Sequence, residues 1–287
     1  MTTSSELLPA DTSMGAVTLW VADLDAMVRY YRDGVGLDVL SESESSAILG
    51  ASNTPIVILE SKPGMKHASP HEAGLFHTAI LFPTQAALAK AVYSVATKYP
   101  GTFTGSADHL VSQAFYFNDP ENNGVELYWD RDRSQWSWVH GSVEMDTLYL
   151  DPNQFLKEHL TQDDVDANKI VGHVHLSVGS IPAAEEFYIK MLGFEQTMNW
   201  GGQALFVSAG GYHHHMAMNT WRSKGAGRRQ LALGLGKVEI NLPEQENIDQ
   251  TRERLDFYRL DSRLDGNRLM LEDPWGNTIS LSTSTQR

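Results

Sequence analysis

Two histidines that could bind a metal ion lie two residues apart in the second half of the chain. The stretch Ile170–Val178 alternates apolar and non-apolar residues as a β-strand does, so His173 and His175 are expected on one face. One of them is the first candidate metal ligand, because imidazole is a common ligand in proteins. The alternative for either residue is a histidine held by hydrogen bonds in the core, which is commoner for a single strand histidine.

A run of three histidines, His213, His214 and His215, could carry proton transfer. A side chain with an unperturbed pKa near 6.5 suits a general acid or base around neutrality. If the run lies in a strand, alternation sends His214 to one face and its two neighbours to the other. One or two of these rings can therefore face a pocket, and the competing interpretation is a surface run that only scavenges metal ions.

The elements that would position these residues occur in duplicate. The strand pattern of Gly15–Val21 resembles that around His173, and the pairs Tyr30-Tyr31 and Gly36-Leu37 recur 157 residues later as Phe187-Tyr188 and Gly193-Phe194. A fixed offset over several landmarks indicates a duplicated half.

Each half contains two units of the order β-α-β-β-β. In the second unit the strand Phe76–Phe82 precedes a helix from about Gln85 to Lys98, and in the fourth the strand Gly236–Pro243 precedes a helix from about Gln245 to Asp256. We expect four parts: a flexible tail over residues 1–13, a first half over 14–131, a connector with a short helix over 132–168, and a second half over 169–284.

Composition narrows the chemistry and the partners. The chain of 287 residues has no cysteine, so any metal must be held by imidazole and carboxylate groups. A formal net charge of −14 argues against nucleic acid and anionic membranes as partners and favours a small-molecule ligand. No run approaches the roughly 18 apolar residues that span a bilayer, and the start lacks signal-peptide features, so we expect a cytoplasmic protein.

These patterns together resemble the vicinal oxygen chelate superfamily, which includes glyoxalases, bleomycin-resistance proteins and type I extradiol dioxygenases. The resemblance covers about residues 14–131 and 169–284, and it is closest to the catechol 2,3-dioxygenase branch. It implies an α+β fold of four βαβββ units forming two open β-barrel-like half domains with helices outside. The motifs that carry it are Gly172-His173-Val174-His175, Phe76-His77, Asp119-Pro120 through Glu126-Leu127, Tyr212 to Met218, and Asp108-His109 with Phe115-Tyr116.

The resemblance also implies a metal site, because family members hold a divalent ion with two first-strand histidines and one last-strand glutamate. His77, Glu126 and His173 occupy such positions, whereas the other corresponding positions hold Ala16, Lys237 and Ser280. A complete set of ligands must therefore combine the second and third units. Two histidines and one carboxylate suit non-haem Fe(II), with Mn(II) as the alternative. His175 could replace His173.

The same resemblance assigns catalytic roles. His214 matches the acid/base histidine, and His215 is the second candidate for that role. Tyr116 matches a tyrosine that hydrogen-bonds the ring hydroxylate. His109 matches a second histidine near that tyrosine, although its spacing from Tyr116 departs from the family pattern. Tyr116 could otherwise be an aromatic residue of the barrel wall.

The function implied is extradiol ring cleavage of a catechol or hydroquinone by O₂. Trp200, Phe206 and Trp221 are candidates for the pocket wall, and a homo-oligomer, either dimer or tetramer, is expected from the fold. One rival is a glyoxalase-like isomerase or lyase using Ni, Zn or Co, which usually has a second carboxylate ligand that we do not find here. The other rival is a resistance protein that binds a small molecule without chemistry.

Overall fold

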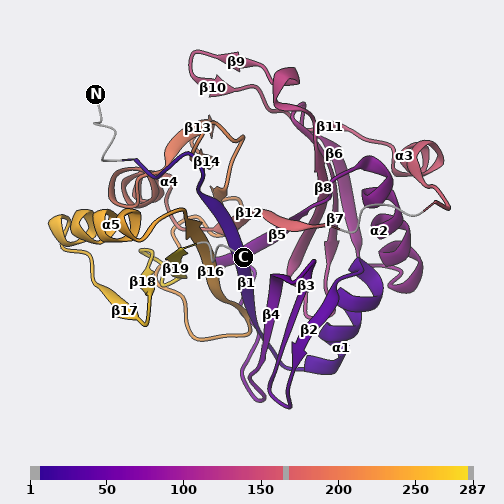
Figure 1. Cartoon of the computed structure of the whole chain (residues 1–287), viewed down its shortest axis with the longest axis horizontal. Helices are drawn as coiled ribbons and strands as arrows, with labels where there is room; N and C mark the ends of the chain where they lie inside the picture. The colour runs from indigo at the N-terminus through magenta and orange to yellow at the C-terminus, as the bar shows by residue number, and fades with distance from the viewer. Residues whose placement is uncertain (1–6, 164–167, 284–287) are drawn as a thin grey trace. The chain divides into compact units, whose positions relative to one another are not determined.

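The computed structural model describes residues 7–163 and 168–283 and has a mixed α+β fold. Four modules follow one another, each with one strand, one helix and three further strands, and the sheets curl into half-barrels (Figure 1). The predicted fold class is therefore confirmed. Among the described residues, no helix is long and apolar enough to cross a lipid bilayer.

The described residues form two compact units, which we call the N-terminal unit (18–65, 77–163 and 168–172) and the C-terminal unit (7–17, 66–76 and 173–283). This division differs from the expected halves, because the first strand begins in the C-terminal unit and the connector belongs to the N-terminal unit. Residues 7–12 differ from the expected flexible tail: Leu8 is buried, and its N–H donates to the Gly193 carbonyl at 2.8 Å.

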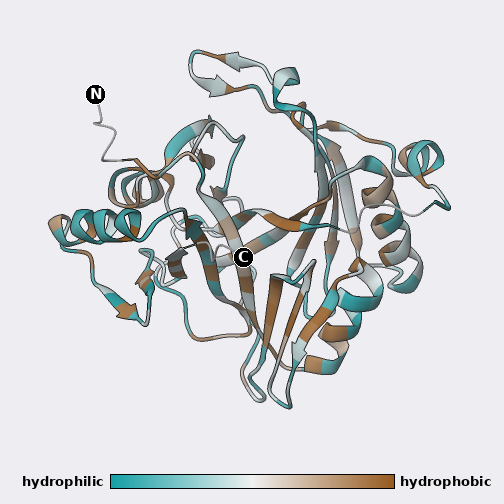
Figure 2. Ribbon diagram, in the orientation of Figure 1, coloured by the Kyte–Doolittle hydropathy of each residue, from teal (hydrophilic) through white to brown (hydrophobic). Residues whose placement is uncertain are grey.

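The N-terminal unit contains the elements of the first two modules. The first module has β1 (Ser13–Val21), α1 (Leu24–Arg29), a π-helical turn η1 (Tyr30–Val35), β2 (Asp38–Glu42), β3 (Ser46–Ala51) and β4 (Thr54–Ser61). The second has β5 (Gly74–Leu81), α2 (Gln85–Lys98), β6 (Phe103–Asp108), β7 (Ser112–Asn118) and β8 (Gly124–Asp130). β1 and β5 begin in the C-terminal unit. Figure 2 shows hydrophobic residues concentrated on β3 and β4, where Ala47, Leu49, Ile56, Val57 and Leu59 are buried.

The helix of the second module is stabilised by a capped N-terminus and by one apolar face. The Thr84 hydroxyl accepts a hydrogen bond from the Ala87 N–H at 3.1 Å, which caps α2 at its first turn. Leu88, Val92 and Val95 are buried where α2 lies against the sheet. In that sheet β5 runs parallel to β8, and β7 is antiparallel to both β8 and β6.

The sheet register places three candidate residues on one face. Ala79 on β5 is paired with Glu126 on β8, and Glu126 is paired with Tyr116 on β7. His77 lies two residues before Ala79 on the same strand, so it shares that face. The second module thus brings His77, Tyr116 and Glu126 together.

The connector extends this sheet. It contains a 3₁₀ turn η2 (Arg133–Gln135), a hairpin of β9 (Trp138–Val139) and β10 (Ser142–Val143), the strand β11 (Leu148–Tyr149) and α3 (Pro152–His159). β11 is antiparallel to β6, and the predicted short helix near Pro152 is confirmed as α3. The part of the connector at residues 164–167 lies outside the described residues.

The C-terminal unit contains the third and fourth modules, except for the first three residues of β12, which belong to the N-terminal unit. The third has β12 (Ile170–Ser177), α4 (Ile181–Ala184), a π-helical turn η3 (Glu185–Met191), β13 (Glu195–Trp200), β14 (Ala204–Ser208) and β15 (Met216–Asn219). The fourth has β16 (Gly234–Leu242), α5 (Gln245–Phe257), β17 (Ser262–Asp265), β18 (Arg268–Glu272) and β19 (Thr278–Thr283). β12 is parallel to β15, and β16 is parallel to β19, as in the second module.

A buried tyrosine–aspartate pair occurs once in each unit and reflects the duplication. The Tyr31 hydroxyl donates to Asp119 Oδ2 at 3.1 Å, and the Tyr188 hydroxyl donates to Asp273 Oδ2 at 3.0 Å. Both tyrosines lie in the π-helical turns, where an ordinary α-helix was expected, and both aspartates open the turn before the last strand of a module. The duplicated aromatic pairs therefore fasten the helix of one module to the final turn of the next.

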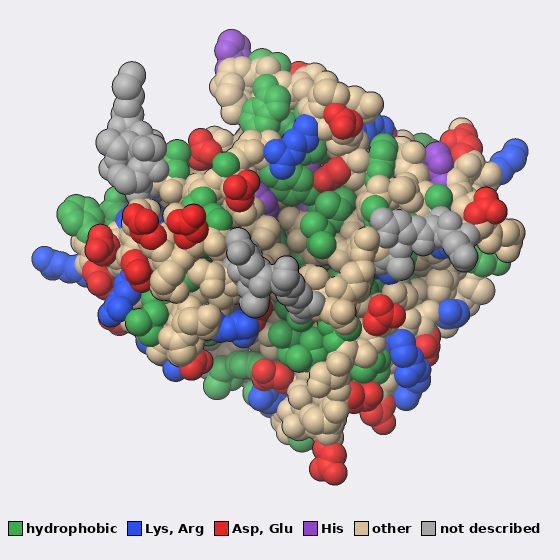
Figure 3. Space-filling view, viewed as in Figure 1, with side chains coloured by type: hydrophobic (Ala, Val, Ile, Leu, Met, Phe, Trp, Pro, Cys, Tyr) green, Lys and Arg blue, Asp and Glu red, His purple; other side chains and the backbone are tan. Residues whose placement is uncertain are grey.

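Charged side chains are distributed over the surface. Figure 3 shows Asp and Glu side chains across the face in view, interspersed with Lys and Arg. This distribution agrees with the net charge of −14 from the full sequence.

Candidate metal centre

His77 and Glu126 form a buried pair on neighbouring strands of the second module. His77 Nε2 lies 2.9 Å from Glu126 Oε2, and the two residues are only 6% and 3% exposed. Two donor atoms that each lie 2.0–2.2 Å from one ion are about 3 Å apart when they subtend a right angle at it. The pair therefore has the separation expected of two ligands to one metal.

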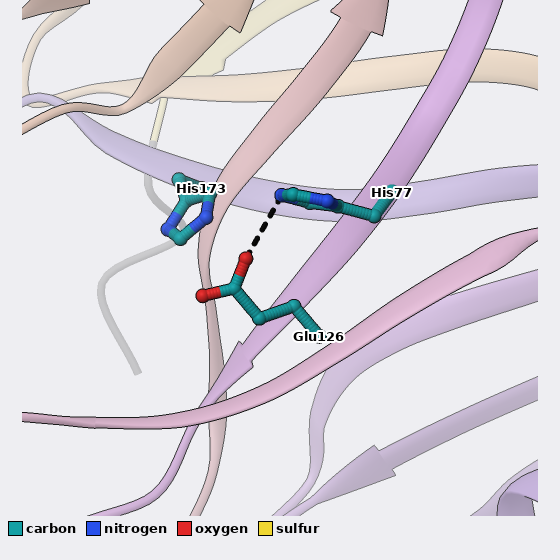
Figure 4. Close-up of side chains that lie close together, drawn as sticks. All are labelled: His77, Glu126 and His173. Atoms are coloured by element: carbon teal, nitrogen blue, oxygen red, sulfur yellow. Dashed lines mark ion pairs between the residues drawn. The ribbon is translucent and has the colours of Figure 1, made fainter. Parts of the chain in front are cut away.

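His173 completes a cluster with this pair. His77, Glu126 and His173 each offer one ligand atom, these three atoms lie within 4.8 Å of one another, and all three residues are buried (Figure 4). The cluster thus offers two imidazoles and one carboxylate, a donor set that suits a divalent transition metal. These are the three residues named as candidate ligands from the sequence, and their role as ligands stays a prediction.

The glycine before His173 is required by its surroundings. A Cβ atom at Gly172 would lie 1.6 Å from the Tyr128 hydroxyl oxygen and 2.7 Å from the ring carbon that bears it. No side chain can occupy that space while Tyr128 keeps its position on β8. The Gly-His motif is therefore explained by the close approach of Tyr128 to the strand that carries the histidine.

Tyr116 on β7 and His109, which directly follows β6, form a hydrogen-bonded pair. His109 Nδ1 lies 2.7 Å from the Asp146 carbonyl oxygen, which can only accept, so Nδ1 carries a proton. In a neutral imidazole Nε2 must then accept, and the Tyr116 hydroxyl, at 2.6 Å, donates to it. Asp146 in the connector thus fixes the tautomer of His109 and the direction of the Tyr116 hydrogen bond.

The environment keeps Tyr116 protonated. Burial raises the pKa of its hydroxyl well above the usual value, and the nearby negative charge of Glu126 raises the pKa further. The ring of Tyr116 lies 5.7 Å from the His77 ring, centre to centre. Tyr116 is therefore a neutral hydroxyl close to His77 and Glu126.

The His214 ring packs against His173 at a tilt of 49° in the C-terminal unit. Their ring centres are 4.1 Å apart, and His214 is 7% exposed. His214 Nδ1 also lies 2.7 Å from Nδ1 of the fully buried His213. Because two imidazole acceptors repel each other, one of these nitrogens must donate, so the two rings share a proton between them.

His215 has a different environment. The Ala209 N–H donates to His215 Nδ1 at 3.3 Å, and the Ser208 hydroxyl lies 3.1 Å from the same nitrogen. These contacts hold the turn between β14 and β15 together. The contacts of His215 therefore stabilise this turn.

The expected alternation of the three histidines is wrong. His213, His214 and His215 lie before β15 and not within a strand, and all three are buried. The cause is the turn at Gly210 and Gly211, whose φ angles of 62° and 68° reverse the chain before the histidines. The run is therefore also not a surface metal scavenger.

His175 is held by hydrogen bonding and aromatic packing. The Asn219 side-chain amide donates to His175 Nε2 at 3.0 Å, and the Phe76 ring centre lies 4.9 Å from that of His175. His175 is not part of the cluster of ligand atoms, so the structure places His173 there and gives His175 other partners.

Two of the three expected pocket aromatics lie near these histidines. The Phe206 ring centre is 5.1 Å from that of His214, and the half-exposed Trp221 is 5.4 Å from His175. Trp200 instead lies at the end of β13 and is 40% exposed. Phe206 and Trp221 therefore form an aromatic surface beside His175 and His214.

Sequence reasoning missed three residues that position the candidates. The Tyr128 hydroxyl leaves room only for a glycine at position 172. The Asp146 carbonyl orients the His109 ring, and the Asn219 amide donates to His175. Asp146 acts through its backbone carbonyl, so its residue type carries no signal. Asn219 is a polar residue at the end of an apolar strand, and only that position in the sequence indicates that its side chain has a specific partner.

The chain is similar to proteins of known family. A model of the Glyoxalase/Bleomycin resistance protein/Dioxygenase superfamily matches residues 13–127. A curated relative from Bacillus subtilis strain 168, named catechol-2,3-dioxygenase, is 34% identical over 271 residues, which are 92% of this chain and 94% of the relative.

Two solved structures share the fold. One, from Bacillus subtilis subsp. subtilis strain 168, has a TM-score of 0.68 and 11% identity and covers 95% of this chain and 85% of that one. The other, glyoxalase I from Zea mays, has a TM-score of 0.59 and 16% identity and covers 95% of this chain and 92% of that one. With the curated relative matched over nearly its whole length, the chain belongs to the glyoxalase/bleomycin resistance protein/dioxygenase superfamily.

Proposed function

We propose that this protein is an extradiol dioxygenase that cleaves the ring of a catechol or hydroquinone with O₂. The observation that carries the proposal is the buried cluster of His77, Glu126 and His173. The name of the relative at 34% identity supports the same reaction class. The metal would be Fe(II), with Mn(II) as the alternative.

The donor set fits such an ion. Two neutral imidazoles and one carboxylate leave coordination positions open for a diol and O₂, and the 2.9 Å separation of His77 Nε2 and Glu126 Oε2 agrees with ligation of one ion. A bound Fe(II) would supply the electronic coupling between an electron-rich ring and O₂. His77, Glu126 and His173 would hold it.

Tyr116 would orient the substrate. Its hydroxyl proton is directed to His109, so its oxygen is available to accept a hydrogen bond from a ring hydroxyl. Because burial raises the pKa of the Tyr116 hydroxyl, this side chain stays neutral and does not act as an anionic ligand. Tyr116 would therefore hold one hydroxyl of the diol in a fixed position.

His214 would accept and return a proton. It lies against His173, and its Nδ1 faces His213, which can exchange a proton with it. Phe206 lies 5.1 Å from His214 and would contact the ring of the substrate. These residues would limit water around the reacting atoms.

The proposed reaction is balanced without an external reductant. The ring carbon–carbon bond beside a hydroxyl-bearing carbon breaks, the O–O bond of O₂ breaks, and both oxygen atoms enter the product. The electrons come from the diol itself. One O₂ is therefore consumed for each ring opened.

The test is anaerobic loading of the full-length protein with Fe(II), followed by addition of O₂ to a panel of catechols and hydroquinones. We expect O₂ uptake and ring-opened product in equal amounts, and no uptake by a His77→Ala variant. His67→Ala, which changes an exposed histidine, is the matched control and should retain activity. Metal-loaded protein that consumes no O₂ with any member of the panel would refute the proposal.

The two rival functions give different results in the same experiment. A glyoxalase-like isomerase would convert its substrate without O₂ and with Ni, Zn or Co, and it usually has a second carboxylate ligand, whereas this cluster has one. A binding protein would keep its affinity for the diol in the His77→Ala variant. An enzyme of the proposed kind should lose both metal and turnover.

A further inference from the structure

One face of the fourth-module sheet carries polar side chains where a purely structural sheet would be apolar. Glu239 on β16 is paired with Ser280 on β19, and Ser280 is paired with Met270 on β18. Lys237 lies two residues before Glu239, and Arg268 lies two residues before Met270. Because residues two apart share a face, all five side chains point to the same side of the sheet.

This face is the counterpart of the one that carries His77 and Glu126. In the second module Ala79 is paired with Glu126, and in the fourth Glu239 is paired with Ser280 across the same parallel strand pair. Lys237 therefore stands in the position of His77, and Ser280 in the position of Glu126. An ammonium group at a ligand position repels a divalent cation, so this face is not a second metal site.

The charges on the face favour an anion. Lys237 Nζ lies 2.8 Å from Glu239 Oε1, and Arg268 Nη1 donates to that same oxygen. Two cations thus share one carboxylate oxygen. Of the other charges at this face, Glu272 is paired with Arg228, and Arg263 and Asp265 on β17 cancel each other, which leaves one positive charge in excess. The side chain of Glu239 is 9% exposed and that of Lys237 is 24% exposed, so solvent screens their charges only in part. The Arg268 side chain is 41% exposed, and its charge is screened more.

Ser280 on β19 lies between Glu239 and Met270 on this face. It is fully buried, and its hydroxyl has no hydrogen-bond partner among the described residues. A buried hydroxyl without a partner is costly, and such groups in native proteins are usually satisfied by a bound molecule or water. Its register places it beside Glu239, on the face that carries the two cations.

The backbone leaves room for this arrangement. A Cβ atom at Gly15 would lie 2.8 Å from Glu239 Cβ, so the glycine allows the start of β1 to approach Glu239 closely. The polar cluster is thus accommodated by its neighbouring strand.

We propose that Lys237, Arg268 and Ser280 form a binding site for a small monocarboxylate. One excess positive charge matches one negative charge, the guanidinium matches the planar carboxylate, and the Ser280 hydroxyl donates to it. Glu239 orients the two cations and opposes a second negative charge, so inorganic phosphate should bind more weakly. This site lies on a different sheet from β12, which carries His173.

The test uses Met270 as a local reporter, because it is the cross-strand neighbour of Ser280. Metal-free full-length protein with ¹³C-labelled methionine methyl groups is titrated with sodium acetate, sodium chloride being adjusted to constant ionic strength. We expect a saturable shift of the Met270 methyl signal, assigned through Met270→Leu. Inorganic phosphate should give a dissociation constant at least about threefold larger.

Variants decide between a ligand site and a structural ion cluster. Lys237→Met should weaken acetate binding about tenfold or more, Ser280→Ala about threefold, and Glu239→Gln should strengthen it. Lys224→Met, an exposed lysine in the same unit, and His77→Ala, in the metal cluster, should leave binding unchanged.

The opposite results overturn the proposal. A Met270 shift that does not saturate, or equal affinity in Ser280→Ala and Glu239→Gln, would show that the cluster is only structural. Phosphate that binds as tightly as acetate would refute the monocarboxylate assignment, and loss of acetate binding in His77→Ala would place the anion at the metal cluster instead.

Discussion

The Tyr116 hydroxyl donates a 2.6 Å hydrogen bond to His109 Nε2, a direction set by the Asp146 carbonyl at the other nitrogen of the ring. Tyr116→Phe removes this donor and the oxygen that would accept from a ring hydroxyl. We expect kcat to fall by about tenfold or more while metal content is unchanged, because a phenylalanine keeps the packing. Tyr149→Phe, at a tyrosine that is 83% exposed, is the control for steady-state kinetics. Unchanged kcat in Tyr116→Phe would remove Tyr116 from the mechanism.

His214 and His215 should respond differently to alanine substitution. His214→Ala should lower kcat by about 100-fold or more and leave metal binding intact, because it removes the proposed proton acceptor. His215→Ala should mainly lower thermal stability, because it removes the acceptor for the Ala209 N–H in the turn before β15. Kinetics below the unfolding transition, together with thermal melts, separate the two effects. A variant of His215 that melts like the wild type but has no activity would reverse the two roles.

Gly172→Ala should destabilise the fold through a single clash. The new methyl group would meet the Tyr128 hydroxyl, 1.6 Å away, so one of the two strands must move. We expect a loss of about 1–3 kcal/mol, measured by urea unfolding. The double variant with Tyr128→Phe should recover part of this loss, and strictly additive effects of the two substitutions would contradict the proposed contact.

Asp119 should make stability depend on pH in the mildly acidic range. Burial raises the pKa of its carboxyl from 3.8 to about 6, although hydrogen bonds from Asn123, Glu121 and Tyr31 act in the opposite direction. Between these two values the folded state holds a proton that the unfolded state has released. The contribution of Asp119 is therefore most favourable below about pH 4 and is lost as the pH rises to about 6.

The expected change is on the order of 3 kcal/mol across that window. Asp119→Asn removes the titrating group while its Oδ1 can still accept from the backbone N–H groups of Glu121 and Asn123. Urea unfolding at several pH values between 4 and 7 should show a flatter dependence for this variant than for the wild type. Asp132→Asn, at an exposed carboxylate, serves as the control, and parallel curves for Asp119→Asn and the wild type would contradict the account.

The sequence was most informative where the duplication repeats a chemical pattern. The aromatic pairs at Tyr30 and Phe187 and the turns at Asp119 and Asp273 define the four modules, and those turns are joined to Tyr31 and Tyr188 by hydrogen bonds in the structure. His77, Glu126 and His173 could be named as candidate ligands because strand position fixes the direction of a side chain, and their role as ligands stays a prediction.

Other features were not predictable, for physical reasons. β6 (Phe103–Asp108) contains Thr, Gly and Ser and is largely solvent-accessible, so it has no apolar alternation. The positions of His213 and His215 depend on the turn at Gly210 and Gly211, which ends the strand before the histidines. The orientation of His109 depends on a backbone carbonyl in the connector, and a tertiary contact of that kind has no sequence pattern.

The most direct test of the central claim is the metal content of single variants of the three cluster residues. The full-length protein and the variants His77→Ala, Glu126→Ala and His173→Ala are loaded anaerobically with Fe(II), desalted and analysed by mass spectrometry of the metal. Glu186→Gln and His67→Ala, both at exposed positions, are the matched controls. We predict about one tightly bound ion in the wild type and both controls, and loss of that ion in each of the three variants. Full metal content in any correctly folded variant of His77, Glu126 or His173 would contradict a shared site.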